Sequence, residues 1–551
     1  MDAELINELK KSVRGEVVTD EETLALYSYC ASLFEVKPQV VVFPIDDEDV
    51  TSVVKFINRH KLKNKNLSVT ARAAGTDMGG GPLNESIILA FGKHMNKFLG
   101  MDGDTATAQP GLFYRDFEKQ TLEHGLLFPS YPASREICAI GGIVNNNSGG
   151  EKSLEYGKTE KYIKKMNVVL SDGNEYQLVC LSEKELQKKI KQNNFEGEIY
   201  KKMFKLVKDN YDLLQKAKPN VSKNSAGYYL WNIYDKEKKT FDLTKLFVGA
   251  QGTLGITTKA TLKLVPTKLH AEMMIIFINN LDHLGDIINA VAPLKPESFE
   301  TYDDHTLKLA IKFFPEFAKK LGTKSMIETA WHFLPEFWMT VTGGLPKLIL
   351  QVEFTGDKRS ELNEKIKELH EKLAPFNLKT HIAPNKKSEK KYWLIRRESF
   401  NLLRQKIRDK HTAPFIDDFV VRPEFLPEFL PKLDLIFKKY PKLIYTIAGH
   451  MGDGNFHIIP LMNIEDPKQR EIIPDLAKEV FELVLSYKGT LTGEHNDGII
   501  RTPYLEEMYG KKVYELFKET KMIFDPKNIF NPGKKVGGSI KFAMSHIRTK
   551  W

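Results

Sequence analysis

Apolar residues alternate with polar ones, or recur at helical spacing, along most of the chain. In the first half, PQVVVFPIDDEDVTSVVKFINRH (38–60) predicts a strand followed by an amphipathic helix with an acidic N-terminus. LSVTARAAGTDMGGGPL (67–83) predicts a strand that runs into a glycine-rich loop. MNVVLSDGNEYQLV (166–179) has two β-rich runs around Asp172-Gly173, which predicts a hairpin. Mixed strands and helices are therefore expected up to about Pro266.

The second half has a different order of patterns. Strand and helix patterns alternate in HAEMMIIFINN (270–280), LDHLGDIINAVAPL (281–294), PKLILQVEFTG (346–356) and RSELNEKIKELHEKLA (359–374). This order predicts an antiparallel sheet with helices on one face. Residues 313–346, rich in Phe, Trp and Pro, interrupt the order and are expected to be an insertion. From Tyr445 to Gly498 the chain becomes rich in Gly, His and Asp, so we expect the chemistry to be concentrated there.

Length and composition are those of a multidomain globular protein. A chain of 551 residues has room for roughly two to four domains. Hydrophobic residues make up 42% and charged residues 28%, which excludes a disordered chain. The net charge of +9 fits an anionic substrate or cofactor, and it equally fits a lysine-rich solvated surface. There is no dense basic stripe with interleaved aromatic residues, so a nucleic-acid partner is not expected.

Cysteine usage and hydropathy predict a location in the cytoplasm. The three cysteines, Cys30, Cys138 and Cys180, have no CxxC spacing, which argues against a disulfide framework or a cysteine-ligated iron–sulfur cluster. The N-terminus has no signal-peptide pattern, and no apolar run reaches the roughly 18–20 residues of a membrane span. The last residues leave two alternatives open, because Ile540, Met544, Ile547 and Trp551 follow helical spacing. They predict either a basic helix on the inner face of a membrane, peripheral at most, or a helix packed on its own domain.

Three segments of the first half are dense in glycine and small polar residues. They are RAAGTDMGGG (72–81), IGGIVNNNSGG (140–150) and GAQGTLG (249–255). Glycine leaves successive backbone N–H groups unobstructed, and such a nest can wrap a pyrophosphate. The segments match neither GxGxxG nor GxxxxGK[ST], so the nicotinamide and P-loop fingerprints are absent. A single loop of this kind is often only a tight turn, but three in one region favour an elongated cofactor.

The order of these segments, with YGK (156–158) between the second and the third, resembles flavoproteins of the vanillyl-alcohol-oxidase/PCMH type. The resemblance is strongest to the branch of D-lactate dehydrogenase, glycolate oxidase and D-2-hydroxyglutarate dehydrogenase. It implies an α+β fold, in which a two-part FAD-binding domain carries a ferredoxin-like antiparallel-sheet cap domain. It also implies that FAD is held by Gly75, Thr76, Asp77, Gly79, Gly80, Pro132, Ser134, Gly141, Gly142, Asn145, Ser148, Gly149, Gly252, Gly255, Ile256 and Asn531. Some members attach FAD through a histidine of the first loop; here that loop has none, so we expect non-covalent FAD.

The histidine-rich segments are AGHMGDGNFHIIP (448–460) and TGEHNDG (492–498). His450 and His457 are an odd number of residues apart and would face opposite ways on a regular strand. Gly452 and Gly454 allow a bulge or turn that brings them together. With Glu494 they would form a two-His-one-carboxylate set, which suits zinc and also manganese or iron. The alternative is two core histidines on glycine-rich turns, and the resemblance, through GHxGDGNxH and GEH, favours the metal site.

The resemblance also implies roles for residues around this site. His495, adjacent to Glu494, is expected to point elsewhere and to act as the base. In YWLIRRESF (392–400), Arg396 matches the arginine that grips the substrate carboxylate, with Arg397 as the alternate. Relatives that handle a second carboxylate have a Lys where this chain has Ile416, and an Asn where it has Ile459. These departures, like Asn496 and Asp497 after GEH, set the chain apart from relatives and favour a monocarboxylate substrate.

The sequence thus predicts an FAD-dependent dehydrogenase that oxidises a 2-hydroxy acid such as D-lactate or glycolate. Electrons would leave to a quinone, a cytochrome or a separate iron–sulfur protein, as the resemblance implies. Two alternatives stay open: an oxidase that uses O₂, and a non-catalytic flavin-binding subunit of a larger complex. The expected parts are a helical segment (1–35), an FAD-binding domain (36–267), a substrate or cap domain (268–500) and a C-terminal segment that returns to the FAD domain (501–551).

Overall fold

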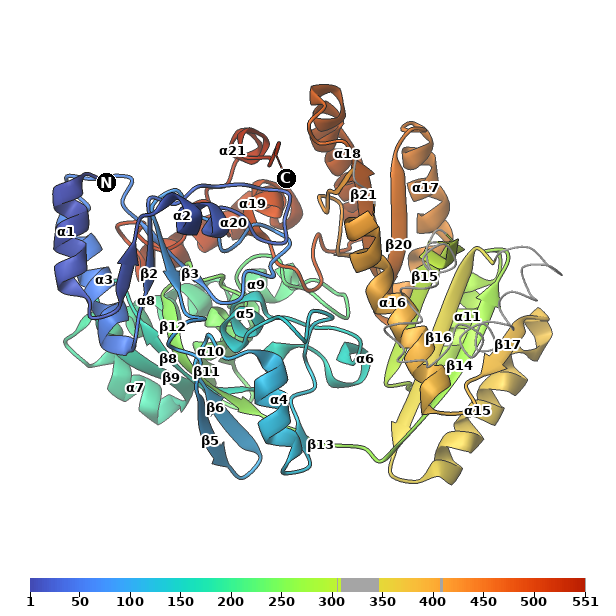
Figure 1. The fold of residues 1–551 in the computed structure, drawn as a ribbon. Coiled ribbons are helices and arrows are strands. Elements are labelled where there is room, and N and C mark those ends of the chain that lie inside the picture. Colours follow the sequence, from blue (N-terminus) through green and yellow to red (C-terminus); the bar gives the residue numbers. More distant parts are fainter. Residues whose placement is uncertain (305, 309–345, 407–409, 551) are drawn as a thin grey trace.

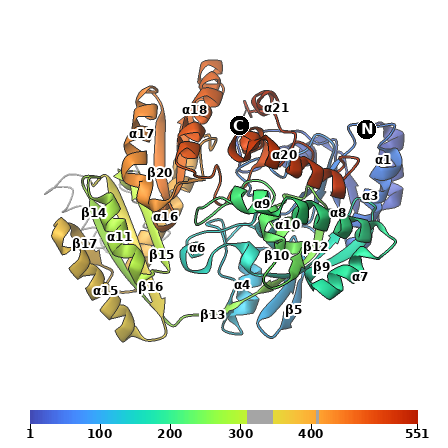
Figure 2. The ribbon, with the colours of Figure 1, turned by 180° about the vertical axis from the view of Figure 1, so that it is seen from behind.

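The chain forms two lobes that lie side by side (Figure 1). The computed structural model describes residues 1–304, 306–308, 346–406 and 410–550. The N-terminal lobe runs from α1 (Ala3–Ser12) to β13 (Val265–Pro266) and includes the C-terminal helices α19 (Gly498–Arg501), α20 (Leu505–Phe524) and α21 (Ile540–Ser545). The cap lobe runs from β14 (His270–Ile278) to α18 (Pro467–Ser486). The view from behind shows the same two lobes (Figure 2).

A four-stranded sheet begins the N-terminal lobe. Its strand order is β1 (Glu16–Val18), β2 (Val40–Phe43), β4 (Ile87–Ala90) and β3 (Val69–Arg72). β2, β4 and β3 run parallel, and the predicted helix after β2 is α3 (Asp47–His60). α3 buries an apolar stripe against this sheet, together with α1, because Val50, Val53, Val54 and Ile57 recur on one face. α2 (Glu21–Tyr27) places Leu24 in a second cluster with Val41 and Ile88.

A seven-stranded antiparallel sheet forms the rest of this lobe. Its order is β10 (Tyr234–Asp235), β11 (Thr240–Asp242), β9 (Glu175–Ser182), β8 (Ile163–Val169), β12 (Ile256–Lys263), β6 (Thr105–Ala108) and β5 (Phe98–Asp102). β8 and β9 form the hairpin predicted around Asp172-Gly173, with Gly173 at φ 81°. The hydrophobic core on this sheet also includes residues of several helices: α4 (Tyr114–Leu122), α5 (Ile140–Asn146), α7 (Glu183–Ile190), α8 (Phe195–Asp209), α9 (Tyr211–Ala217), α10 (Thr244–Phe247) and α20. Two smaller elements are α6 (Ser153–Tyr156) and the ribbon of β7 (Leu126–Leu127) with β13.

The cap lobe is built on one antiparallel sheet. Its order is β17 (Lys379–Ile382), β14, β16 (Leu348–Gly356), β15 (Ser298–Asp303), β20 (Ile444–His450), β21 (Asn455–Met462) and β18 (His411–Thr412), with β19 (Phe419–Val420) also paired to β21. On one face lie α11 (Leu284–Val291), α15 (Arg359–Leu373), α17 (Leu426–Lys438) and α18. The predicted α+β class, with an antiparallel sheet in the second half, is confirmed.

One helix of the cap lobe lies on the opposite face. α16 (Lys386–Lys406) packs Tyr392, Trp393 and Ile395 against the alternate residues of β14 and β16, such as Ile275 and Ile349. The prediction of helices on one face alone is therefore wrong for α16. Both views place α16 between the cap sheet and the N-terminal lobe (Figures 1 and 2). This matters for function, because α16 carries Arg396 and Arg397.

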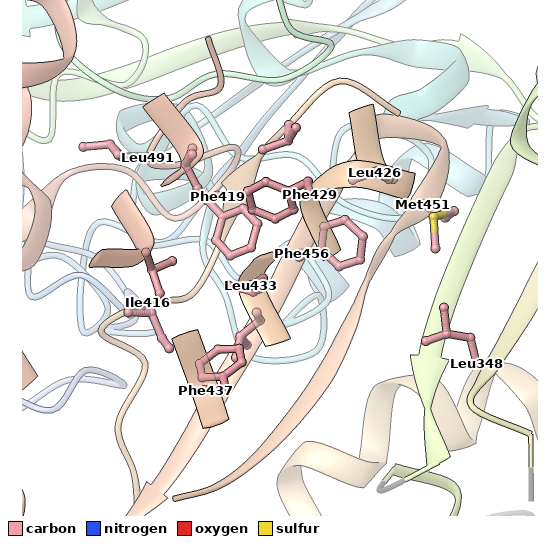
Figure 3. Packing of buried hydrophobic residues seen from close by; sticks show 14 of the residues in the cluster. Leu348, Ile416, Phe419, Leu426, Phe429, Leu433, Phe437, Met451, Phe456 and Leu491 are labelled. Atoms are coloured by element: carbon pink, nitrogen blue, oxygen red, sulfur yellow. The ribbon is translucent and has the colours of Figure 1, made fainter. Parts of the chain in front are cut away.

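The larger core of the cap lobe lies under α17 (Figure 3). Ile416 is fully buried in the same apolar cluster as Phe419, Phe429 and Phe456. Burying an apolar side chain of this size stabilises the fold by about 1.5–3 kcal/mol. The side chain of Ile416 therefore contributes to the packing of this hydrophobic core.

The end of the chain returns to the N-terminal lobe. Ile547 is buried and pairs with Phe34 in an isolated antiparallel β-bridge. The N–H of Arg548 donates to the carbonyl of Leu33 at 2.8 Å. The segment after α21 thus packs on its own lobe, whereas α21 itself ends at Ser545 and has no buried residue, so a peripheral contact of this helix with a membrane stays a prediction. In the part of the chain that the structure describes, no helix has the length and apolarity needed to cross a membrane. Trp551 and, except for Pro346, the expected insertion at 313–346 lie outside the described residues.

Candidate functional site

The β20–β21 hairpin brings His450 and His457 to one face of the cap sheet. β20 ends at His450, the turn Met451–Asp453 follows, and β21 starts at Asn455. In this register Ala448 lies opposite His457, so both histidines point the same way and their rings are 5.3 Å apart. Gly454 is required in the turn, because its φ is +65° and a Cβ there would lie 1.8 Å from the carbonyl oxygen of Val421. The expected turn between the two histidines is thus present.

Glu494 and His495 turn toward these histidines together. The buried carboxylate of Asp418 accepts the N–H groups of Glu494 (2.9 Å) and His495 (2.7 Å), so the peptide wraps around it. The ring of His495 stacks on His457 with centroids 5.0 Å apart. The expectation that His495 points elsewhere is wrong, because the alternation of neighbouring side chains holds on a strand and not on this loop.

Carboxylates hold the Nδ1 atoms of all three histidines. Asp417 contacts His457 Nδ1 at 3.0 Å through Oδ1 and His495 Nδ1 at 2.6 Å through Oδ2. Glu300 of β15 contacts His450 Nδ1 at 2.6 Å. A carboxylate partner at Nδ1 leaves Nε2 as the ligand or base atom, and metal-bound histidines usually have such a partner. No role was predicted for either of these two carboxylates from the sequence.

The charges of this cluster are strongly coupled. Burial lowers the pKa of His450, but Glu300 and Glu494 outweigh it and raise this pKa to about 9. For His495, Asp417 and Asp418 likewise outweigh burial and raise the pKa to about 9. Burial dominates at His457, whose pKa is lowered.

The donor set fits a divalent metal ion. Asp418, His457, Glu494 and His495 offer ligand atoms within 4.8 Å of one another. His450 Nε2 lies 3.3 Å from Oε1 of Glu494, so it approaches the same carboxylate. Asp418 already accepts the two loop N–H groups and the hydroxyl of Thr492, so we regard it as a residue that shapes the loop. The remaining imidazole and carboxylate donors suit zinc, manganese or iron.

Glu494 forms an ion pair with a lysine for which no role was predicted from the sequence. Lys223 lies between α9 and the β10–β11 ribbon, and its Nζ is 2.6 Å from Glu494 Oε1 and 3.0 Å from Asp453 Oδ2. Burial opposes its charge, but the two carboxylates raise the pKa of Lys223 above its usual value. Lys223, with His450, holds the pKa of Glu494 well below its usual value despite burial. The only sequence signal was a lysine in a stretch of small residues, PNVSKNSAG (219–227).

The two adjacent arginines of α16 have different partners. Arg397 forms a two-pronged contact with Glu151, in which Nε donates to Oε2 at 2.9 Å and Nη2 donates to Oε1. Arg396 instead lies beside the histidine cluster, with Nε 3.2 Å from Oε2 of Glu300. The position next to the cluster therefore belongs to Arg396.

The three glycine-rich loops meet in the N-terminal lobe. The first lies between β3 and β4, the second covers α5 and the residues after it, and the third precedes β12. Asn146 Nδ2 donates to Asp77 at 3.0 Å, and Gln251 Nε2 donates to Asn146 Oδ1 at 3.2 Å, which joins all three. Asp77 also accepts the N–H groups of Gly79 and Gly81. Asn146 and Gln251 were not among the predicted residues.

Most predicted cofactor residues lie on these loops. Gly75, Thr76, Asp77, Gly79 and Gly80 are on the first, Gly141, Gly142, Asn145, Ser148 and Gly149 on the second, and Gly252, Gly255 and Ile256 on the third and the start of β12. Pro132 and Ser134 follow β7. Asn531 joins the first and third loops, because its amide donates to the carbonyls of Gly81 and Gln251. Both amide hydrogens of Asn531 are thus used within the protein.

The histidine cluster adjoins the glycine-rich loops. A Cβ placed on Gly149 would lie 3.3 Å from Glu494 Oε1. Asn496 donates to the carbonyls of Asn146 and Gly249, and the N–H of Ile499 donates to the carbonyl of Gly79 at 2.8 Å. The segment after Glu494-His495 therefore fastens the cluster onto all three loops.

Two family models match this chain. Residues 38–178 match the FAD binding domain, and residues 268–535 match the C-terminal domain of FAD linked oxidases. The chain belongs to the FAD-linked oxidases. The second glycine-rich loop of this FAD-linked oxidase leaves room for a cofactor at Gly142. A Cβ there would meet only Ala73 Cβ, at 3.8 Å, apart from the backbone of its own helix, among the described residues within 4 Å.

Several curated relatives are similar over most of this FAD-linked oxidase. D-2-hydroxyglutarate dehydrogenase of Pseudomonas putida is 27% identical over 96% of this chain and 51% of its own length. Glycolate oxidase subunit GlcD of Bacillus subtilis is 28% identical over 92% of this chain and 91% of its own. D-lactate dehydrogenase of Archaeoglobus fulgidus is 26% identical over 90% and 91%. The chain thus spans about half the length of the first relative.

Solved structures share the fold. 4-Ethylphenol oxidase from Gulosibacter chungangensis superposes with a TM-score of 0.69 at 16% identity, covering 98% of each chain. p-Cresol methylhydroxylase gives a TM-score of 0.68 at 15% identity, covering 97% of this chain and 96% of its own. At this level of identity the likeness establishes the architecture of the FAD-linked oxidase and nothing about its substrate.

Proposed function

We propose that this FAD-linked oxidase is a dehydrogenase that oxidises a 2-hydroxy acid to the 2-oxo acid. The observation that carries the proposal is the place of Glu494, whose Oε1 lies 3.3 Å from the position that a Cβ on Gly149 of the second glycine-rich loop would take, and which lies in a cluster with His450 and His457. A hydroxy acid held by this cluster would lie next to a flavin bound on that loop. The names of the curated relatives support this reaction class.

Each part of the substrate has a partner in this proposal. Arg396 binds the carboxylate, because a guanidinium presents a planar fork of donors. His450, His457 and Glu494 would hold a divalent metal, with zinc favoured over manganese and iron, which would lower the pKa of the substrate hydroxyl. His495 accepts the hydroxyl proton at Nε2, while Asp417 holds its Nδ1. FAD, held by the three glycine-rich loops, would supply the oxidant by accepting a hydride from C2 of the substrate.

A divalent cation also bears on the state of His495. Like charges repel, so a cation bound beside this imidazole favours its neutral form. The neutral form is the one that accepts a proton.

We further propose a monocarboxylate substrate such as D-lactate or glycolate. Ile416 is fully buried in the apolar core under α17, and Ile459 follows His457 on the same face of β21 (Figure 3). Neither position offers a cation or amide for a second carboxylate. A larger rate constant for flavin reduction by D-2-hydroxyglutarate than by D-lactate would contradict this choice.

The decisive experiment is an anaerobic panel of 2-hydroxy acids read by bleaching of the flavin absorbance. Reduction by D-lactate or glycolate supports the proposal, and no reduction by any acid of the panel contradicts it. Mixing the reduced protein with air then distinguishes a dehydrogenase, which reoxidises slowly, from an oxidase. Acid precipitation tests the expected non-covalent FAD, since the yellow colour should stay in the supernatant. A quinone, a cytochrome or a separate iron–sulfur protein is the proposed electron acceptor.

The chain segments have different roles in the proposed enzyme. Residues 36–267 and 501–551 form the FAD-binding part, residues 268–500 form the substrate part, and residues 1–35 precede them. The reacting groups then lie where the two parts meet, as Lys223 and Glu494 do.

A further inference from the structure

Glu300 occupies a central position on the face of the cap sheet that carries the histidines. It lies on β15, directly opposite His450 in the pairing of β15 with β20. Its side chain is almost completely buried. α16 covers the same face, so Glu300 lies between the histidine cluster on one side and Arg396 on the other.

The two oxygens of Glu300 contact two different partners. Oε1 lies 2.6 Å from His450 Nδ1, and Oε2 lies 3.2 Å from Arg396 Nε. The Nε–H of Arg396 is buried and makes no regular hydrogen bond within the described part of the chain, so this contact is an ion pair. One carboxylate thus joins the proposed metal ligand to the proposed carboxylate-binding residue.

We propose that Glu300 is a positioning residue that fixes His450 and Arg396 relative to each other. This inference rests on the proposed function and deepens it. A 2-hydroxy acid has its hydroxyl and its carboxylate on neighbouring carbons, so the groups that bind them must be held at a fixed separation. Glu300 provides that fixed separation, because the two oxygens of its one planar carboxylate contact both residues.

The chemistry on each side supports this role. A carboxylate at Nδ1 selects the tautomer of His450 that carries its proton there, which leaves Nε2 free to bind a metal beside Glu494. A carboxylate at Nε fixes the plane of the Arg396 guanidinium, whose outer edge is formed by Nη1 and Nη2. The substrate carboxylate can then bind that outer edge in one orientation.

A glutamine at this position separates the two functions. Glu300→Gln keeps the size of the side chain, but it has only one acceptor oxygen. If that oxygen faces Arg396, the amide hydrogens face His450 Nδ1 and select the tautomer that cannot offer Nε2 to a metal. If it faces His450, the amide hydrogens oppose the donor of Arg396. Either way one partner is lost.

The experiment compares purified holo-protein of the wild type with Glu300→Gln and Glu272→Gln. Glu272 is the matched control: it is buried in β14 of the same sheet and pairs with Arg359, away from the histidine cluster. Zinc affinity is measured by competition with a chelator, and affinity for a 2-oxo acid by perturbation of the flavin spectrum. Glu300→Gln should lose about 10–100-fold in at least one of the two affinities, the usual range for removing the hydrogen-bond partner of a metal-bound histidine, while Glu272→Gln changes neither.

A second comparison distinguishes positioning from general damage. If Glu300 acts through Arg396, the losses of 2-oxo acid affinity in Glu300→Gln and Arg396→Gln should not add in the double variant. A measurable loss of 2-oxo acid affinity in Glu300→Gln that adds to the loss in Arg396→Gln, or unchanged zinc and 2-oxo acid affinities in Glu300→Gln, overturns the proposal. A wild-type protein that no 2-hydroxy acid reduces would overturn the proposed function instead. The zinc measurement needs no turnover, so it would still decide the role of Glu300.

Discussion

The Nζ atom of Lys223 lies 2.6 Å from Oε1 of Glu494, and this buried ion pair joins the two lobes at the histidine cluster. Lys223 belongs to the N-terminal lobe, whereas Glu494 follows the last helix of the cap lobe. The ammonium group also reaches Asp453 in the hairpin turn. Lys223 is thus one of the contacts that hold the cap hairpin over the glycine-rich loops.

Replacing Lys223 by Met should destabilise the protein strongly. The change leaves Glu494 and Asp453 as buried carboxylates without this cation, and breaking a buried pair costs about 3–5 kcal/mol. We expect a lower thermal midpoint and slower flavin reduction. Lys205→Met is the control, since its pair with Asp209 is exposed and should matter little. A Lys223→Met protein as stable and as active as the wild type would refute this account.

The arginines of α16 should respond differently to the same change. Arg396→Lys should raise KM and lower kcat/KM, because a point charge cannot replace a planar fork at the substrate carboxylate. Arg397→Lys should act mainly on stability, because Arg397 binds Glu151 of the N-terminal lobe. Steady-state kinetics with the best acid of the panel decides the matter. If KM rises only in Arg397→Lys, the register assigned to α16 is off by one.

The features of the fold and the site that could be predicted from the sequence are those that depend on neighbouring residues in the chain. The glycine-rich loops and the turn between His450 and His457 depend on residues close together in the chain, and the structure contains both. Glu300, Asp417 and Lys223 could not be found this way. They meet their histidine or carboxylate partners across 150, 78 and 271 residues of chain, and no local pattern records such a contact.

The error at His495 has the same origin. Alternation of side chains was a sound rule for a strand, but the loop around Glu494 is shaped by Asp418, 76 residues earlier. The face of the cap sheet on which α16 packs could not be predicted either, because the helical spacing of its apolar residues is compatible with both faces. Contacts between residues far apart in the sequence therefore determine the detailed geometry of the site, whereas the local sequence patterns predict only that a site is present.

Glu353 should make stability depend on pH. Burial, and secondarily the nearby Glu297, raise the pKa of Glu353 to about 7, although Trp393 donates to it. A raised pKa in the folded state means that the contribution of this group to stability is complete below about pH 4.5, its unfolded value. That contribution is lost as the pH rises through about 7.

Glu353→Gln removes this titration and keeps an acceptor for Trp393. Its thermal midpoint should therefore gain on the wild type between pH 5 and pH 8, by the equivalent of up to about 3 kcal/mol. Glu361→Gln, an exposed site on α15, serves as the control and should show no such gain. A constant difference between Glu353→Gln and the wild type over this pH range would contradict the raised pKa of Glu353.

The last prediction separates the proposed metal ligands from the proposed base. His450→Ala, His457→Ala and Glu494→Ala each remove one ligand, so metal content and activity should both fall. FAD should stay bound, because the predicted cofactor residues lie on loops of the other lobe. His495→Asn should keep both metal and FAD but lose about 10²–10⁴-fold in turnover, the usual range for a positioned base.

The structure makes this comparison sharper than the sequence did. His495 stacks on His457 and lies within the same group of ligand atoms as Glu494, so either neighbour has the reach to bind the metal. The two roles differ in what each variant retains. If His495→Asn is empty of metal while Glu494→Gln is fully loaded and slow, the histidine is the ligand and the glutamate is the base. Since Lys223 holds Glu494 ionised and Asp417 holds His495 at Nδ1, we expect the opposite result: a loaded, slow His495→Asn and an empty Glu494→Ala.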